Sequence, residues 1–212
     1  HELKTPIFTI KGFVDTLLDG ALEDSNVNKI FLMKIKKQSN RLDNLFSDLI
    51  DITKIESNEL ALNMESIRLQ NIIDWLETSY ESKAKSKDII LVFPDCSNIT
   101  IKADLKYIKS VFSNLLENAI NYSDKGKIII SIKNISESKI SISILDNGIG
   151  IKNSQLGRIF ERFYRVDNDR SRDTGGTGLG LAIVKHILDA HGSKIRVESK
   201  VNQGTVFSFE LN

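Results

Sequence analysis

The feature that most constrains the fold is a long segment, residues 28–57, that contains no glycine or proline. Within it, apolar residues recur every seven positions, and two series carry the repeat: Ile35, Leu42 and Leu49, and Phe31, Gln38, Leu45 and Ile52. A seven-residue apolar repeat over three to four heptads is typical of helices that pack against partner helices. The segment therefore predicts one long helix with an apolar seam.

The segment before it, residues 2–18, also places its apolar residues on one face of a helix. Between the two, residues 20–26 carry the glycine stop signal and the polar cap signals of a helical hairpin. Two helices alone bury too little surface to be stable, so a second copy that completes a four-helix bundle is expected. A monomeric hairpin that packs on its own second domain is the alternative.

The remaining chain, residues 66–212, alternates between helical and strand patterns. Helices are predicted at residues 71–85, 105–120 and 179–191, and strands at 89–93, 99–102, 127–135, 139–145, 195–201 and 205–211. This order predicts an α+β chain, in which an antiparallel two-helix hairpin precedes an α/β sandwich with a mixed sheet covered by helices on one face. We therefore expect two domains, residues 1–58 and 66–212, joined by a short linker near residues 56–65.

Composition excludes several classes of protein. The 29 lysines and arginines nearly balance the 28 aspartates and glutamates, so nucleic acid and acidic membrane surfaces are not expected partners. The single Cys96 cannot form an internal disulfide, which fits a reducing compartment. No apolar run approaches the roughly 20 residues that a membrane-spanning helix needs. We therefore expect no direct membrane contact from this part of the protein. Because the chain also lacks an initiator methionine, we expect it to be a fragment of a longer protein.

Two glycine-rich motifs flank a long polar stretch. Residues 146–150 (DNGIG) follow a predicted strand, and residues 176–181 (GTGLGL) open a predicted helix. Glycines allow close backbone approach, and a helix N-terminus offers free N–H groups to anionic phosphate. Taken alone, the second motif is equally consistent with a structural turn. The stretch between the motifs, within residues 147–177, is longer than an ordinary connection and is interpreted as a lid loop.

Two amides add to this pattern. Asn114 and Asn118 are four residues apart on a strongly amphipathic predicted helix, and therefore lie on one face of it. Amides that face the same way suit a hydrated cation and a phosphate, although asparagine pairs on helices are more often simply solvated.

Five motifs in this order resemble those of histidine kinases. Residues 114–123 are similar to the N box, 146–151 to the G1 box, 160–164 to the F box and 176–181 to the G2 box, while residues 1–6 (HELKTP) are similar to the H box. The resemblance covers essentially the whole chain, and residues 204–207 (GTVF) also resemble the terminal strand of the family's ATP-binding domain. It implies the catalytic core of a two-component sensor histidine kinase, similar to phosphate-regulon-type or cell-wall-type sensors.

The resemblance also implies roles in binding ATP and Mg²⁺. Asp146 should accept a hydrogen bond from the adenine amino group, and Tyr122 should lie against the base. Asn118 should ligate Mg²⁺, Asn114 should support the metal or the phosphates, and Arg165 should reach the γ-phosphate. Further ATP-binding residues implied by the two glycine motifs are Gly148, Gly150, Thr177, Gly178, Leu179 and Gly180.

The H box implies the other half of the chemistry. His1 would accept the phosphoryl group, since an imidazole is a good acceptor when one nitrogen is free to attack. Glu2 resembles the family's acid/base group, and Thr5 lies one helical turn from His1, where it would orient water for removing phosphate from the partner. The implied partners are a second copy of the chain and the receiver domain of a response regulator, whose aspartate would receive the phosphate. The implied location is the cytoplasmic side of a membrane-anchored receptor.

One departure and two alternatives complete this interpretation. Many family members carry a lysine where this chain has Asn121, so the site has one cation fewer unless Arg158, Arg162 or Lys125 compensates. An ATP hydrolase of the same superfamily would carry a glutamate at the position of Asn114, and an amide cannot act as that base. A catalytically weak scaffold or phosphatase-only module is the alternative function. His186 and His191 lack a motif context and are not interpreted as catalytic. His191, just before Gly192, is interpreted as a helix C-terminal residue favoured by the helix dipole.

Overall fold

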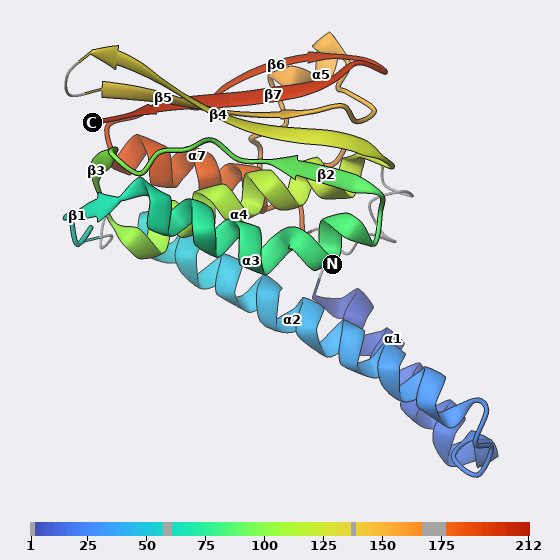
Figure 1. The fold of residues 1–212 in the computed structure, drawn as a ribbon. Coiled ribbons are helices and arrows are strands. Elements are labelled where there is room, and N and C mark those ends of the chain that lie inside the picture. Colours follow the sequence, from blue (N-terminus) through green and yellow to red (C-terminus); the bar gives the residue numbers. More distant parts are fainter. Residues whose placement is uncertain (1–2, 57–60, 137–138, 167–176) are drawn as a thin grey trace. The chain divides into compact units, whose positions relative to one another are not determined.

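The computed structural model describes residues 3–56, 61–136, 139–166 and 177–212. The chain divides into two compact units, His1–Lys54 and Ile55–Asn212. In its described part the first unit is helical, whereas the second combines helices with strands (Figure 1). Within the described ranges, no helix is both long enough and apolar enough to cross a membrane.

The first unit is the helical hairpin predicted from the heptads. It contains α1 (Lys4–Thr16) and α2 (Asn28–Glu56), and a π-helical turn at Leu17–Ala21 extends α1. Gly20 lies in that turn with φ 117°, a conformation that glycine adopts without a Cβ clash, so the helix ends near the predicted stop signal. Between the helices the rings of Phe13 and Phe31 lie 5.5 Å apart, centroid to centroid.

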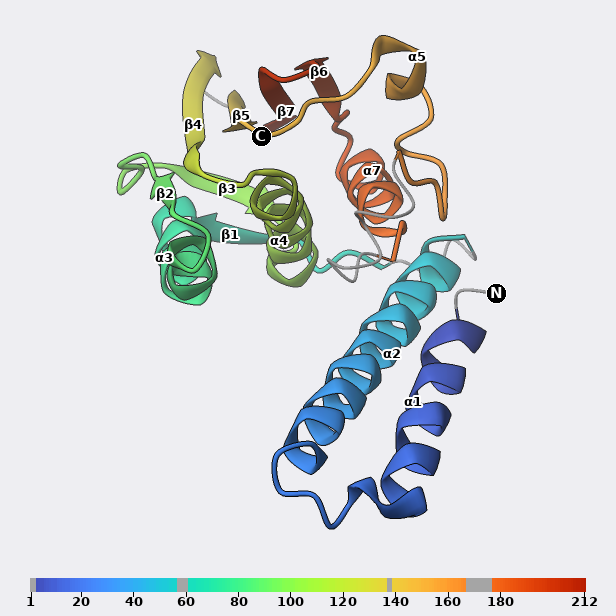
Figure 2. The ribbon, with the colours of Figure 1, turned by 90° about the vertical axis from the view of Figure 1, so that its right-hand side faces the viewer.

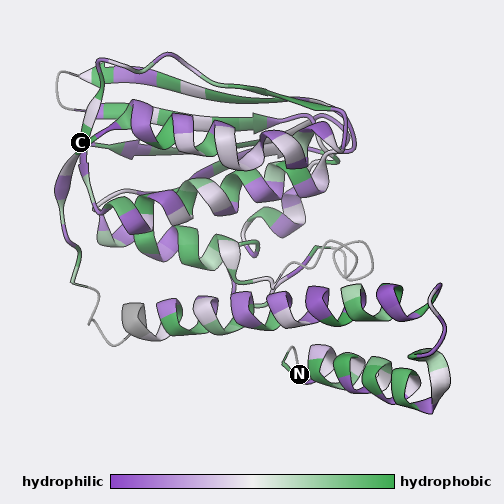
Figure 3. Ribbon diagram, turned by 60° about the horizontal axis from the view of Figure 1, so that its bottom comes forward, coloured by the Kyte–Doolittle hydropathy of each residue, from purple (hydrophilic) through white to green (hydrophobic). Residues whose placement is uncertain are grey.

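Large apolar side chains of both helices are exposed. Hydrophobic residues run along both helices (Figure 3). Examples are Ile7, Phe8, Leu18, Ile30, Leu32, Met33, Phe46 and Ile50. Phe8 is 68% exposed and Leu18 is 73% exposed. Exposed apolar surface of this extent marks an interaction site rather than an ordinary solvent-facing surface.

The second unit is built on a mixed five-stranded sheet with the order β2-β4-β5-β7-β6. Its strands are β2 (Ile89–Val92), β4 (Gly126–Ser136), β5 (Lys139–Asp146), β6 (Arg196–Lys200) and β7 (Gly204–Leu211). The β2–β4 pair is parallel and the other pairs are antiparallel, which confirms the expected mixed sheet.

Two further strands form a separate antiparallel pair, β1 (Glu65–Arg68) with β3 (Thr100–Ala103). The sequence did not predict β1, and its first residue was placed in the linker. Only Ile67 of its four residues is buried, so the strand carries too little alternation to be recognised.

Three helices lie on one face of the five-stranded sheet, as Figures 1 and 2 show: α3 (Leu69–Lys85), α4 (Leu105–Tyr122) and α7 (Gly180–Ala190). A fourth, short helix, α5 (Asn153–Leu156), follows the first glycine motif. The helix layer and the sheet meet in an apolar core, where the ring of Phe112 on α4 packs edge-on against that of Phe209 on β7 at 5.8 Å. Burial alternates along β5, so Ile142, Ile144 and finally Asp146 are buried while the residues between them are less so. The last inward position of β5 is thus a carboxylate.

Candidate nucleotide site

Helix α4 carries three of the predicted site residues at intervals of one helical turn: Asn114, Asn118 and Tyr122. The helix begins at Asp104, whose carboxylate accepts a hydrogen bond from the Tyr107 N–H group at 3.2 Å. The apolar face of α4 is fully buried, while Asn114, Asn118 and Tyr122 are half-buried. The helix therefore presents its polar residues at the border of the core.

Asn114 lies directly against the start of α7. Its amide group donates to the carbonyl of Ser110 at 2.9 Å, and its Oδ1 atom packs on Gly180, where a Cβ atom would overlap it. A side chain at position 180 would therefore force the Asn114 amide to move. Asn114 thus fixes the position of the α7 N-terminus.

Asp146, at the end of β5, is 6% exposed. Its Oδ1 atom accepts hydrogen bonds from the backbone N–H groups of Gly148 (2.8 Å) and Thr205 (3.2 Å). Among the described residues no donor reaches Oδ2. Burial raises the pKa of Asp146 above its ordinary value, and the two N–H groups oppose this shift only in part. The site therefore contains a buried carboxylate with one oxygen left to accept a hydrogen bond.

The loop after Asp146 is held against the end of α4. The N–H group of Ile149 donates to the Tyr122 carbonyl at 3.2 Å, and the Asn147 side chain donates to the Lys125 carbonyl at 2.9 Å. A Cβ atom at Gly148 would collide with that same Tyr122 carbonyl, so glycine is needed at this position. The first glycine motif and the last turn of α4 therefore form one rigid wall.

Strands β6 and β7 hold the other side of this loop. The Ser199 hydroxyl accepts from the Ile151 N–H group at 2.8 Å, donates to the Gly204 carbonyl at 2.9 Å and lies 2.8 Å from the Thr205 hydroxyl. Sequence reasoning missed Ser199 as a site residue. It noted the Gly204–Thr205 pair but gave no role to Thr205, whose N–H group binds Asp146.

The second glycine motif forms a helix N-terminus without a side-chain cap. The Leu179 N–H group donates to the Thr177 hydroxyl at 3.2 Å, and α7 then starts at Gly180 with no side chain of the described residues capping its first turn. Gly178 has φ 73° and its carbonyl accepts from the Phe163 N–H group at 2.9 Å, which joins this motif to the predicted F box. Uncapped N–H groups at the start of a helix form an anion site.

Arg165, two residues beyond Phe163, has a buried Nη2 atom with no hydrogen-bond partner among the described residues. A buried unpaired guanidinium nitrogen is costly unless an anion or water satisfies it. Arg158, one of the cations predicted to compensate for Asn121, is instead engaged by Glu161 at 3.2 Å and lies 4.4 Å from the Tyr164 ring centroid.

Lys87 is a cation that the sequence analysis missed. It lies beyond the end of α3, and its Nζ atom donates to the carbonyls of Ile120 (2.8 Å) and Asn121 (3.2 Å) in the last turn of α4. A cation at this position satisfies carbonyls that the helix leaves unpaired and interacts favourably with the helix dipole. The backbone of Asn121, the residue that stands where many family members have a lysine, is therefore bound by a lysine from another part of the chain.

The predicted phosphoacceptor residues His1 and Glu2 lie outside the described residues. Thr5 is exposed in the first turn of α1, where its carbonyl accepts from the Thr9 hydroxyl at 2.9 Å. Part of the predicted lid, residues 167–176, also lies outside the described ranges.

His191 lies at the C-terminal end of α7, as the sequence analysis expected. Its Nδ1 atom lies 2.8 Å from the Ile187 carbonyl, and its Nε2 atom accepts from the Asp104 N–H group at 3.1 Å. The two bonds together require the neutral tautomer with the proton on Nδ1. His191 thus joins the end of α7 to the start of α4.

The geometry can bind an anion at the start of α7 and a hydrogen-bond donor at Asp146, and α4 holds the two subsites together. Within the described ranges no group of three or more His, Cys, Asp or Glu residues could hold a metal ion. Mg²⁺ that accompanies a nucleotide needs only one or two protein ligands, because phosphate oxygens and waters supply the others. The fold and the site define a nucleotide-binding α/β domain that follows a helical hairpin in the chain.

Comparison with known proteins agrees with this class. Residues 103–212 match the family model described as "Histidine kinase-, DNA gyrase B-, and HSP90-like ATPase", and residues 1–58 match the "His Kinase A (phospho-acceptor) domain". The chain therefore belongs to the histidine kinase family.

Two relatives illustrate the match. Sensor histidine kinase WalK of Bacillus subtilis (strain 168) is 35% identical over 214 residues, which cover 100% of this chain and 35% of WalK. Sensor-like histidine kinase SenX3 of Mycobacterium tuberculosis (strain ATCC 25618 / H37Rv) is 35% identical over 211 residues, which cover 100% of this chain and 51% of SenX3. The chain thus spans about a third of WalK and about half of SenX3.

Solved structures show the same fold. Acinetobacter baumannii histidine kinase AdeS superposes with a TM-score of 0.81 at 25% identity and covers 100% of this chain and 97% of the AdeS chain. Histidine kinase ThkA, in a crystal structure with the response regulator protein TrrA, superposes with a TM-score of 0.77 at 29% identity. The match covers 100% of this chain and 58% of the ThkA chain.

Proposed function

We propose that this chain is the catalytic core of a sensor histidine kinase that binds ATP and transfers the γ-phosphoryl group to His1. The observation that carries the proposal is that α4 contacts both the loop of the buried Asp146 and the uncapped start of α7. A nucleotide needs both a reader for its base and an anion site for its phosphates. The family membership supports ATP as that nucleotide.

The base would bind at the Asp146 end. The free Oδ2 atom of Asp146 would accept a hydrogen bond from the adenine amino group, which guanine cannot donate from the same position. Tyr122 would lie against the base, while Gly148 and Gly150 allow the loop to close on α4 and β6.

The phosphates would bind at the start of α7. The N–H groups of Gly178 and Gly180 would supply an anion site, with Thr177 and Leu179 beside it, and Arg165 would give its unpaired Nη2 atom to the γ-phosphate. Asn114 keeps this helix start in place through its contact with Gly180.

Asn118 would be the protein ligand of Mg²⁺, since its amide oxygen is a hard donor on the same face of α4 as Asn114. The metal would neutralise charge that develops on the phosphates during transfer. Asn118 is half-buried at the border of the core, which suits a ligand shared between protein, phosphate and water.

His1 would act as the nucleophile of the transfer. One ring nitrogen would attack the γ-phosphorus as the bond to the bridging oxygen breaks, and ADP would carry that oxygen away. Glu2 would hold the proton on the other ring nitrogen. Thr5 is one turn along α1 and would orient the water that removes phosphate from the partner.

We further propose two protein partners. The exposed apolar residues of the hairpin, with its heptad seam, would form a four-helix bundle with a second copy of the chain. A response regulator would receive the phosphate on an aspartate, as the crystal structure of ThkA with a response regulator suggests by analogy.

The domain limits and location are also proposals. We assign residues 1–58 to dimerisation and phosphotransfer and 66–212 to ATP binding, on the cytoplasmic side of a longer, membrane-anchored receptor. The matched share of WalK and SenX3, 35% and 51%, leaves room for such additional segments.

Incorporation of label from γ-labelled ATP with Mg²⁺ tests this function. We would compare this chain, a version extended upstream of His1, and the extended version with His1→Gln or, as a control, His186→Gln. We expect acid-labile, alkali-stable label that His1→Gln abolishes and His186→Gln preserves. An extended protein that binds ATP but takes up no label would contradict the proposal and favour a scaffold or phosphatase-only role.

A further inference from the structure

The C-terminal turn of α4 is capped by groups from two other segments of the chain. A helix leaves its last four carbonyls without a partner of its own, and α4 ends at Tyr122. The carbonyls of Ile120 and Asn121 accept from the Lys87 Nζ atom, at 2.8 Å and 3.2 Å. The Tyr122 carbonyl, the next in the chain, accepts from the Ile149 N–H group at 3.2 Å. One lysine and one amide of the first glycine loop therefore bind three successive carbonyls at this end of the helix.

The turn that carries Lys87 is itself held in place. The Lys87 N–H group donates to the Ala84 carbonyl at 3.0 Å, which ties the turn to the end of α3. Asp88, the next residue, has φ 53°, a left-handed conformation that aspartate adopts more readily than most residues. Its carbonyl accepts from the Gly126 N–H group at 3.2 Å, at the start of β4. The half-buried Lys87 side chain therefore extends from a fixed backbone.

The end of α4 that Lys87 binds also faces the loop that follows Asp146. The Asn147 side chain donates to the Lys125 carbonyl at 2.9 Å, three residues beyond the helix. A Cβ atom at Gly148 would overlap the Tyr122 carbonyl, so the loop and the helix end are in close contact. A shift of the last turn of α4 would therefore displace the loop, and it would move Tyr122 as well.

Lys87 is the charged member of this cap. Hydrogen bonds from an ammonium group to a carbonyl are stronger than those from a neutral amide, such as that of Ile149. A cation at the C-terminal end of a helix also interacts favourably with the helix dipole. Removal of the Lys87 charge should therefore loosen the last turn of α4 and its contact with the first glycine loop.

We propose that Lys87 is a positioning residue of the nucleotide site. Its ammonium group holds the last turn of α4, and through the Tyr122 carbonyl it holds the loop of Asp146 in the geometry that binds the base. Lys87 acts through α4 and does not touch the nucleotide. The inference rests on the proposed function and deepens it, because it adds to the site a residue that lies outside both glycine motifs.

Two other roles of Lys87 predict different results. A lysine that only joins α3 to α4 would lower stability when it is replaced, but the folded variant would bind ATP as the wild type does. A lysine that contacts the phosphates would, when replaced, weaken binding of tripolyphosphate, which lacks the base, as much as binding of ATP. Loss of a positioning residue should weaken binding of ATP and leave binding of tripolyphosphate nearly unchanged.

The first test measures dissociation constants of the full chain with Mg²⁺ for ATP and for tripolyphosphate, at about 0.15 M salt, where charges more than roughly 8 Å apart are largely screened. Lys87→Met keeps the aliphatic stem and should weaken ATP roughly 5- to 10-fold and tripolyphosphate less than about 2-fold. Lys87→Arg, which keeps charged donors, should bind ATP more tightly than Lys87→Met. Lys85→Met, the matched control, removes an exposed lysine that pairs with Glu81 and should change neither constant.

The second test measures amide hydrogen exchange without nucleotide. The Ile149 amide, which is bonded to the Tyr122 carbonyl, should exchange roughly 5- to 10-fold faster in Lys87→Met than in wild type. The Ile183 amide, which is bonded to the Leu179 carbonyl at the start of α7, should exchange at the wild-type rate. Because global unfolding exposes both amides, their comparison separates a local loosening from a general loss of stability.

Three results would overturn this inference in a chain that binds ATP. They are equal weakening of ATP and tripolyphosphate by Lys87→Met, unchanged ATP binding by the folded variant, and equal acceleration of the Ile149 and Ile183 amides. A wild-type chain that binds no ATP would instead overturn the proposed function, and the role of Lys87 at that site with it. The wild-type binding measurement thus distinguishes the two failures.

Discussion

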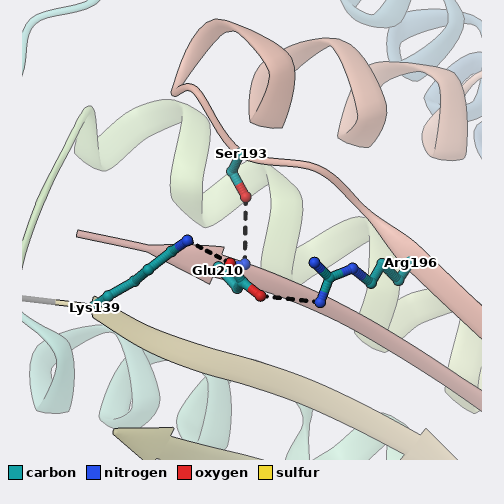
Figure 4. A network of polar contacts seen from close by, with 4 residues as sticks. All are labelled: Lys139, Ser193, Arg196 and Glu210. Carbon is teal, nitrogen blue, oxygen red and sulfur yellow. Dashed lines mark hydrogen bonds and ion pairs between the residues drawn. The ribbon is translucent and has the colours of Figure 1, made fainter. Parts of the chain in front are cut away.

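The two ends of strand β5 place carboxylates in opposite surroundings. At one end, Asp146 is buried and its pKa is raised by that burial, while its hydrogen-bond partners among the described residues are neutral backbone N–H groups. At the other end, Glu210 of β7 contacts Lys139 at 2.6 Å and Arg196 at 2.9 Å, and these partners hold its pKa below its ordinary value (Figure 4).

The two carboxylates differ in how many of their oxygens are already bound. Both oxygens of Glu210 are occupied by cations, and its N–H group donates to the Ser193 hydroxyl at 3.3 Å. A cavity of about 250 Å³ adjoins this end, but the carboxylate within it is already neutralised. Asp146 has one oxygen without a donor in the described part of the chain. A buried carboxylate with a raised pKa is more often a functional group.

The largest expected difference between the two ends of β5 is in the stability lost when a glycine with positive φ is replaced by alanine. Gly204 (φ 101°) lies against the Asp146 carbonyl, whereas Gly192 (φ 70°) at the Glu210 end has open space around it. Gly204→Ala adds a backbone clash to the conformational strain and should lower the free energy of unfolding by about 3 kcal/mol or more. Gly192→Ala should cost only the strain, about 1 kcal/mol. Urea unfolding of both variants measures this, and equal losses would contradict the close approach at Gly204.

A second difference appears in the pH dependence of stability at Asp146. Because its folded-state pKa lies above the ordinary 3.8, the stabilisation present below pH 3.8 is lost as pH rises through the folded-state pKa. Asp146→Asn keeps an acceptor for both N–H groups but cannot ionise. We therefore expect its free energy of unfolding to increase relative to wild type as pH rises from 3.8, measured by urea unfolding over a pH series. A constant difference across the series would show that burial does not oppose ionisation there.

Ionisation of Glu210 should change the free energy of unfolding with pH in the opposite direction, and by less. Its pKa is lowered from 4.5, so the stabilisation is present above pH 4.5 and is lost as pH falls through the folded-state pKa. Glu210→Gln should be slightly less stable than wild type near neutral pH, and the gap should close in acid and in high salt because the ion pairs are exposed. Thermal unfolding at low and high ionic strength checks this. A stability difference between wild type and Glu210→Gln that does not depend on ionic strength would mean that the ion pairs do not contribute to stability.

Much of the fold follows from patterns that the sequence displays locally. The heptads of α2, the amphipathic α4 and the alternation along β5 each depend on residues close together in the chain, so they predicted the elements well. Strand β1 was missed because it has four residues and gains its identity only by pairing with β3.

Candidate site residues could be named from the sequence where they stand in a motif. Asp146, Asn114 and the glycines stand in motifs that resemble those of a nucleotide-binding family, and their roles stay predictions. Lys87 and Ser199 were not predictable, because their roles depend on backbone groups outside their own local pattern: Lys87, for example, binds carbonyls 33 and 34 residues away. A side chain that binds a distant backbone group leaves no local pattern.

Equilibrium binding of ATP with Mg²⁺ to the full chain, compared with Asp146→Asn and Glu210→Gln, tests the central claim most directly. We expect wild type and Glu210→Gln to bind alike, and Asp146→Asn to bind roughly 10- to 100-fold more weakly, because its amide can direct a donor at the adenine amino group. Equal affinity in all three proteins would contradict the assignment of Asp146 as the reader of the base.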